Sequence, residues 1–136
     1  MSNLYNEQEN KWAAQISNCK ITNIQIGWAR KKFDLEDDEA PTFKQIVLAC
    51  EEENYQLWFR EPKKPELEFF EEAKNKDFGN WKIVGIYDDN DNSGFYAVAI
   101  ETGEYTTNKV DNGVFFSVRG TEPTTQEQYS TFPTTS

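Results

Sequence analysis

The sequence predicts one α+β domain with a largely antiparallel sheet of about six strands and two helices. Three observations favour this fold class. Segments with strand-like patterning outnumber those with helical spacing, the links between them are short and rich in turn residues, and no internal repeat is evident. Residues 1–120 are expected to form the domain, and residues 121–136, rich in Thr and Ser, a flexible C-terminal tail.

The first element is predicted to be an amphipathic helix over residues 4–19. Ser2 or Asn3 is available as its N-cap. The positions that define one face recur every three or four residues: Tyr5, Gln8, Trp12, Ile16 and Cys19. The next segment, ITNIQIGWARKKF (residues 21–33), changes to a period of two and is predicted to be a strand, since Ile24, Ile26 and Trp28 share one face.

The middle of the chain is predicted to be a loop, two strands and a second helix. The acidic run Asp34–Glu39, closed by Ala40 and Pro41, indicates a loop. FKQIVLAC (43–50) and NYQLWFR (54–60) are expected to be strands that flank a hairpin connection at Glu51–Glu53.

The second helix is expected from residue 66 to about residue 77. Pro65 is well placed for its first turn, and Leu67, Phe70 and Ala73 would face inward. Gly79 would end the helix with a left-handed cap.

Three apolar segments follow, and each is predicted to be a strand. They are WKIVGIY (81–87), GFYAVAI (94–100) and GVFFSVR (113–119). Both alternate sets of side chains are largely apolar, which is typical of central strands that are covered on both faces.

The loop between the first two of these strands raises the question of a calcium site. Residues 89–94 match the first six positions of a helix–loop–helix calcium loop. The twelfth position, which must supply a bidentate Glu, is Ile100, and Glu101 comes one residue too late. The flanking segments are also strand-like, so the sequence predicts a hairpin loop rather than a metal site.

The commonest general base and the recognisable catalytic motifs are missing. The chain has no histidine, no nucleophile elbow and no phosphate-binding Gly-rich loop. We therefore predict no enzymatic activity, catalytic residue, metal or cofactor. A pair of carboxylates that hydrolyses a glycoside or binds magnesium stays an alternative, because the 24 acidic residues supply many candidates.

A cytoplasmic setting is expected. The first residues lack a signal-peptide pattern, and the longest apolar stretch, Ile46–Cys50, is too short to cross a membrane. The two cysteines, Cys19 and Cys50, are expected to be reduced, buried thiols, with a disulfide or a reactive cysteine as alternatives.

Clustered negative charge carries the functional prediction. The net charge is −10, and the carboxylates gather in runs. Such a field repels nucleic acids and anionic membranes and attracts basic protein surfaces. We expect a protein partner with a basic surface, no direct binding of nucleic acid and no membrane binding. The alternative is that the acidic loops only keep the protein soluble.

The predicted function is a non-catalytic acidic binding module or inhibitor. A sharper version is a nucleic-acid mimic, like phage-encoded anti-defence proteins, that occupies the basic channel of its target. Trp58, with Phe59 and Arg60, is the preferred anchor, although an edge strand that buries Trp58 or Phe59 is an alternative. The predicted acidic contacts are Asp34, Glu36, Asp37, Asp38, Glu39, Glu51, Glu52 and Glu53.

Residues 81–123 resemble the early strands of class 3 lipase-like α/β-hydrolases, through WKIVGIY, SGFYAVAI and GVFFSVRGTEP. The resemblance implies that Gly120 forms a tight turn and that Thr121 contributes to the oxyanion hole. Val118 departs from the Phe that is usual in the family, and the nucleophile, acid and histidine do not follow. The resemblance therefore implies a truncated relative without activity.

A third hypothesis is a small-anion-binding protein. Arg119 would lie at the mouth of an aromatic-lined pocket and hold the anion. Alternation places Arg119 on the same face as Phe115 and Ser117, where pairing with an acidic neighbour is the competing role.

Overall fold

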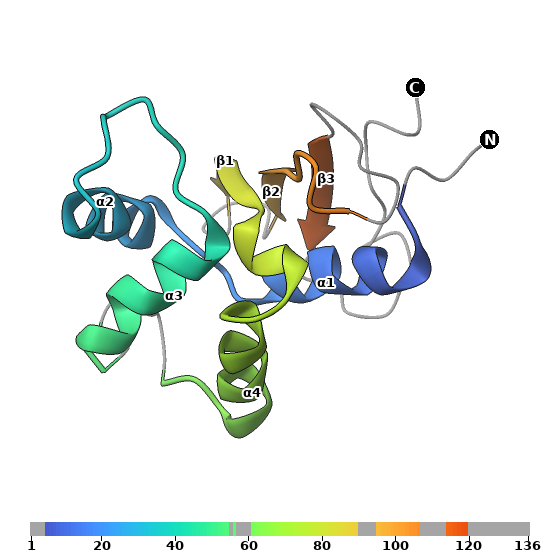
Figure 1. The fold of residues 1–136 in the computed structure, drawn as a ribbon, viewed down its shortest axis with the longest axis horizontal. Helices are drawn as coiled ribbons and strands as arrows, with labels where there is room; N and C mark the ends of the chain where they lie inside the picture. The colour runs from blue at the N-terminus through green and yellow to red at the C-terminus, as the bar shows by residue number, and fades with distance from the viewer. Residues whose placement is uncertain (1–4, 55, 57–60, 90–94, 107–113, 120–136) are drawn as a thin grey trace.

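A computed structural model describes residues 5–54, 56, 61–89, 95–106 and 114–119 of the chain (Figure 1). These residues form four α-helices, one short 3₁₀-helix and a three-stranded sheet. In chain order the elements are α1 (Glu7–Asn18), α2 (Asn23–Lys32), α3 (Phe43–Glu52), α4 (Lys64–Ala73), η1 (Asp77–Asn80), β1 (Lys82–Asp89), β2 (Phe95–Glu101) and β3 (Val114–Arg119).

The predicted fold, with about six strands and two helices, is wrong: the described part of the chain is rich in helix. Residues 21–33, predicted as a strand, contain α2. Ile24 and Ile26 do not share a face, because Ile24 is 63% exposed while Ile26 is buried. The buried positions are Gln25, Ile26 and Ala29, which follow helical spacing. Thr22 and Gln25 form a capping box that starts the helix.

Residues 43–50 are also helical rather than extended. Gln45 N donates to Thr42 Oγ1 at 3.1 Å, and Thr42 N donates to Gln45 Oε1 at 3.0 Å, so a second capping box begins α3. A short apolar run of this kind fits a buried helix as well as a strand. The buried side chains of α3 are Phe43, Ile46, Val47, Ala49 and Cys50. Most of the predicted strand 54–60 lies outside the described residues.

The first predicted helix is confirmed as an element, with a later start. Asn6, rather than Ser2 or Asn3, is the N-cap of α1, and Asn6 and Glu9 form a capping box. The predicted face is correct at Tyr5, Ile16 and Cys19, which are buried, but wrong at Gln8, which is exposed.

The second predicted helix is confirmed as α4, but it is shorter than predicted. Pro65 lies in its first turn as expected, and Phe70 and Ala73 are buried. Leu67 is exposed, and Phe69 takes the inward position instead. Gly79 is not a left-handed cap, since it lies within η1. A Cβ atom at Gly79 would lie 1.8 Å from the carbonyl oxygen of Ala73, so the close approach of two backbones requires glycine here.

The three strands predicted near the C-terminal end are confirmed, and they form an antiparallel sheet in the order β1-β2-β3. Asp89 pairs with Phe95, so residues 90–94 join neighbouring antiparallel strands, as a hairpin connection requires. The loop residues themselves lie outside the described part. The register of β1 shifts between Ile83 and Gly85, which indicates a β-bulge at Val84.

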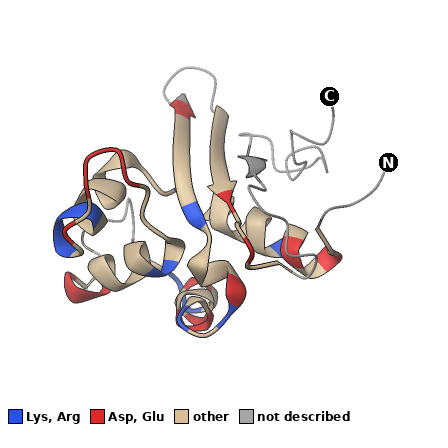
Figure 2. Ribbon diagram, turned by 45° about the horizontal axis from the view of Figure 1, so that its top comes forward, with Lys and Arg blue, Asp and Glu red and all other residues tan. Residues whose placement is uncertain are grey.

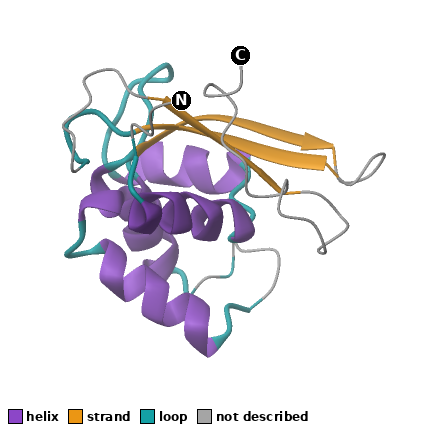
Figure 3. Cartoon of the chain, turned by 90° about the vertical axis from the view of Figure 1, so that its right-hand side faces the viewer, coloured by secondary structure: helices purple, strands orange, loops and turns teal. Residues whose placement is uncertain are grey.

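The helices lie on one side of the sheet (Figure 3). Tyr96, Val98 and Ile100 of β2 are fully buried on the inner face. On β1, Val84 is 46% exposed and Tyr87 is 56% exposed. The prediction that these strands are covered on both faces is therefore wrong for β1.

An aromatic cluster fills the core where the helices meet the sheet. Phe69 and Phe78 stack with their ring centroids 4.6 Å apart, and Trp12 lies 4.9 Å from Phe78. Trp81 is fully buried at the start of β1. One continuous cluster joins buried residues from Tyr5 to Ile100. In the described residues, no helix is both long and apolar enough to cross a membrane. The predicted tail, residues 121–136, lies outside them.

Candidate functional site

The acidic loop, residues 34–39, connects α2 to α3, and five of its six residues are acidic. Figure 2 shows this loop mostly in red. Its backbone is held in place at both ends. Leu35 N donates to Arg30 O at 2.9 Å, and Arg30 Nε donates to Glu39 O at 2.9 Å. Glu39 N donates to Glu36 O at 3.0 Å within the loop. The predicted loop is confirmed, and hydrogen bonds fix the backbone that carries its acidic residues.

The carboxylates of the acidic loop have no ion pair within the described part of the chain. All five acidic residues are exposed. The nearest cations in the sequence have other contacts, because Arg30 binds a backbone carbonyl and Lys32 pairs with Glu52. Lys31 lies over the Trp28 ring, 5.6 Å from its centroid. Arg30 thus brings one positive charge to the loop backbone, whereas no ion pair among the described residues engages the five carboxylates, which face solvent.

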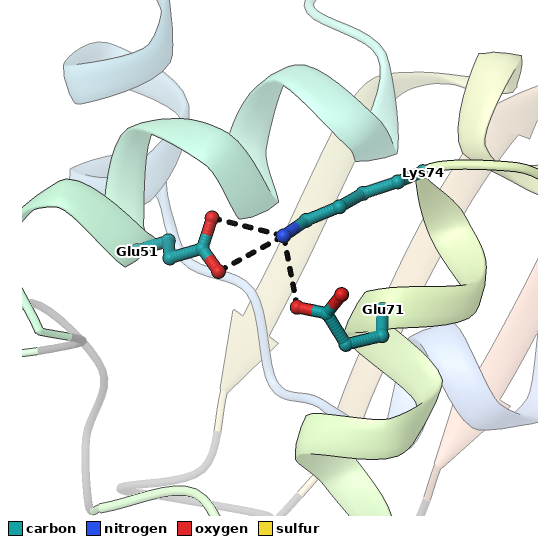
Figure 4. A network of polar contacts seen from close by, with 3 residues as sticks. All are labelled: Glu51, Glu71 and Lys74. Carbon is teal, nitrogen blue, oxygen red and sulfur yellow. Dashed lines mark hydrogen bonds and ion pairs between the residues drawn. The ribbon is translucent and has the colours of Figure 1, made fainter.

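Of the three acidic contacts predicted at Glu51–Glu53, two form ion pairs with other helices of the same chain. Glu51 accepts from Lys74 Nζ at 2.9 Å and 3.1 Å, and Lys74 also donates to Glu71 at 2.8 Å (Figure 4). The hydrogen bonds that Lys74 donates to Glu71 and then to Glu51 raise the pKa of its ammonium group. Glu52 pairs with Lys32, whereas Glu53 caps the helix and is exposed. Glu51 and Glu52 thus join helices, although the Glu52 side chain stays 61% exposed.

The remaining predicted residues are placed only in part. Trp58, with Phe59 and Arg60, lies outside the described residues, and so does Thr121. Arg119 is the last residue of β3, and its Cα pairs with that of Tyr96. The predicted strands of the lipase-like stretch are neighbours in the sheet, but the resemblance itself stays a prediction, since the position of Thr121 is not described.

The structure shows a site that sequence reasoning missed. A turn hollow of about 450 Å³ lies where β2 ends and β1 begins, lined by Asn80, Lys82 and residues 101–105. Gly103 adopts a positive φ of 58°, which glycine tolerates without strain. The sequence hints at this turn only through Thr102 and Gly103, which follow an apolar strand. Two residues are too short a motif to indicate a pocket.

A pair of aromatic side chains lies near the other end of the same two strands. Tyr87 and Phe95 meet edge to face, with ring centroids 5.5 Å apart. Tyr87 is more than half exposed, whereas most large apolar side chains of the described residues are buried in the core. The apolar pattern placed Tyr87 in a covered strand and so gave no reason to consider it as a contact residue.

The two cysteines are part of the packed core. Cys19 and Cys50 are free and buried, which confirms the expected thiols. Burial raises the pKa of Cys50 to about 12, so its thiol holds its proton. Throughout the described ranges, no group of three or more Cys, Asp or Glu residues is arranged to hold a metal ion.

The chain was compared with models of protein families, with curated proteins and with solved structures, and none of the three comparisons gave a match.

Proposed function

We propose that this protein acts by docking, without catalysis, on a basic surface of a protein partner. The observation that carries the proposal is the acidic loop, whose five exposed carboxylates form no ion pair in the described residues while hydrogen bonds with Arg30 anchor its backbone. Charge of this kind speeds association and fixes orientation. The net charge of −10 adds to the same field.

The inhibitor version of the proposal is that the acidic loop takes the place of a nucleic-acid backbone. Carboxylates on an anchored loop would then meet the lysine and arginine side chains that normally hold phosphates. DNA should displace such a complex, and rising salt should weaken it steeply. The turn hollow gives little support to anion binding, because Glu101 and Glu104 outnumber Lys82 in its lining.

The experiment compares three forms of the full chain as bait in an extract of the native host. The loop variant neutralises four adjacent carboxylates, and the control variant neutralises four exposed ones elsewhere. The loop variant is E36Q/D37N/D38N/E39Q, and the control variant is E7Q/E68Q/E72Q/D77N. Captured proteins are identified by mass spectrometry at low and high salt, with and without added duplex DNA.

The proposal predicts a basic protein that the wild-type chain and the control variant retain at low salt. The loop variant should lose it, and high salt should release it from all baits. Release by DNA would support the mimic, and resistance to DNA would reject that version alone. Equal capture by the loop variant and the wild type would reject the whole proposal.

A further inference from the structure

The turn hollow has the dimensions of a ligand site. Its volume of about 450 Å³ lies within the range of small-ligand pockets, which is roughly 300–1,000 Å³. It is open to solvent, and its lining residues are mostly polar and include Tyr105, which is 41% exposed.

The walls of the hollow are held by the core. Trp81, fully buried, donates from Nε1 to Tyr105 O at 2.8 Å. Thr102, only 1% exposed, lies with its Oγ1 3.4 Å from the hydroxyl of Tyr5. The turn that carries the lining residues is therefore tied to the core at two points, so a ligand would meet a preformed site.

The charged groups of the hollow have no ion pair in the part of the chain that the structure describes. Lys82 and Glu101 are paired positions on neighbouring strands, yet no ion pair or hydrogen bond engages either side chain within the described residues. The same holds for Glu104 in the turn. The lining thus offers two carboxylates and one ammonium group, and with the net charge of the chain this favours a cation.

We propose that the turn hollow binds a guanidinium group. The planar fork of a guanidinium matches carboxylate acceptors such as Glu101 and Glu104, and its flat face stacks well on an aromatic ring such as Tyr105. This chemistry has two sources, free arginine and an arginine side chain of a polypeptide. Only free arginine carries a carboxylate beside its amine, for which Lys82 is the available partner.

The test is an NMR titration of the full, ¹⁵N-labelled chain with two probes. L-arginine represents the free ligand, and N-acetyl-L-arginine amide represents an arginine residue in a polypeptide. We expect saturable shifts at the amides of Asn80, Lys82 and residues 101–105, with millimolar dissociation constants for ligands of this size. E101Q/E104Q should weaken binding about tenfold or more, because two charged acceptors are lost.

Controls separate this proposal from the docking function. E68Q/E72Q removes two exposed charges on α4 and should bind both probes like the wild type, as should the loop variant. A preference for L-arginine that K82M abolishes would identify the free ligand, and a preference for the amide would identify a polypeptide side chain. If the double variant does not fold, E101Q and E104Q are titrated singly.

The proposal is overturned by any of three results. The first is an absence of saturable shifts in the hollow, and the second is equal affinity in the variants of Glu101 and Glu104. The third is equal affinity for N-acetyl-L-lysine amide, which would show that the site does not select a guanidinium. None of these results bears on the acidic loop, so the docking function would stand or fall separately.

Discussion

At the scale of single residues, replacing either of two glycines by alanine should change the free energy of unfolding in opposite directions. Gly79→Ala should lower the free energy of unfolding by about 1–3 kcal/mol, because its Cβ would collide with the backbone oxygen of Ala73. Gly27 lies within α2, and a Cβ atom there would meet nothing within 4 Å. Gly27→Ala should raise stability by about 0.5–1 kcal/mol, since alanine favours helices. Urea denaturation measures both, and equal effects would contradict the packing described at Gly79.

The thiol of Cys50 predicts a specific dependence of stability on pH. In the unfolded chain it ionises near its ordinary pKa of 9.0, whereas the folded protein holds the proton to about pH 12. The unfolded state therefore binds fewer protons over this range, and stability present below pH 9 is lost as the pH rises toward 12.

Cys50→Ala tests this dependence. Above the ordinary thiol pKa of 9.0, the free energy of unfolding should fall less steeply in the variant, by about 1.4 kcal/mol per pH unit relative to the wild type. Other groups titrate equally in both proteins, so the difference between the two slopes isolates this thiol. Parallel slopes in alkaline denaturation curves would contradict its burial.

At the scale of elements, Lys74 joins α3 to α4. It lies between Glu51, near the C-terminal end of α3, and Glu71 of α4. A cation here offsets carboxylates that the helix dipole disfavours at a C-terminal end. Lys74→Met should cost about 0.5–1 kcal/mol at low salt and less at high salt, because the three side chains are partly exposed.

Lys64→Met provides the matched control for Lys74→Met. Lys64 is exposed at the first turn of α4, where a positive charge is unfavourable, so its removal should leave stability unchanged or slightly higher. Denaturation at two salt concentrations distinguishes the variants. A salt-independent loss at Lys74 would indicate that its methylene chain, rather than its charge, stabilises the contact.

The helices show why the sequence predicted the fold only in part. Pro65 marked the start of α4, and the apolar runs of β1, β2 and β3 identified strands, because both signals are local. The segments of α2 and α3 are short and apolar on alternate as well as helical positions, so their periodicity was ambiguous. Two residue pairs, Thr22 with Gln25 and Thr42 with Gln45, would have indicated helices, since each pair forms a capping box at a helix start.

The candidate sites were predictable to different degrees. The acidic loop is visible in the sequence because it is contiguous, and its exposure follows from its composition. The engagement of Glu51 by Lys74, 23 residues away, depends on tertiary packing that no local pattern reports. The turn hollow likewise joins Lys82 to residues 101–105 through strand pairing, and so it was missed.

At the scale of the whole molecule, the clustered negative charge should lower the free energy of unfolding. The carboxylates of the acidic loop repel one another and the rest of an anionic protein. Neutralising four of them in the loop variant should leave the free energy of unfolding unchanged or raise it by up to about 1 kcal/mol at low salt. The gain should shrink at high salt, where screening acts over a few ångströms.

Denaturation of the loop and control variants checks this prediction. A loss of stability confined to the loop variant would show that the carboxylates serve the fold. In that case, the concentrated charge of the acidic loop would no longer be evidence for a protein partner.

The most direct measurement is the dependence of the association rate constant on ionic strength, with the purified partner recovered from the extract. The wild-type chain and the control variant should associate fast at low salt and slow down steeply as salt is added. The loop variant should start from a lower rate and show a clearly shallower slope. Identical slopes for the loop variant and the wild type would contradict the claim that residues 34–39 guide docking.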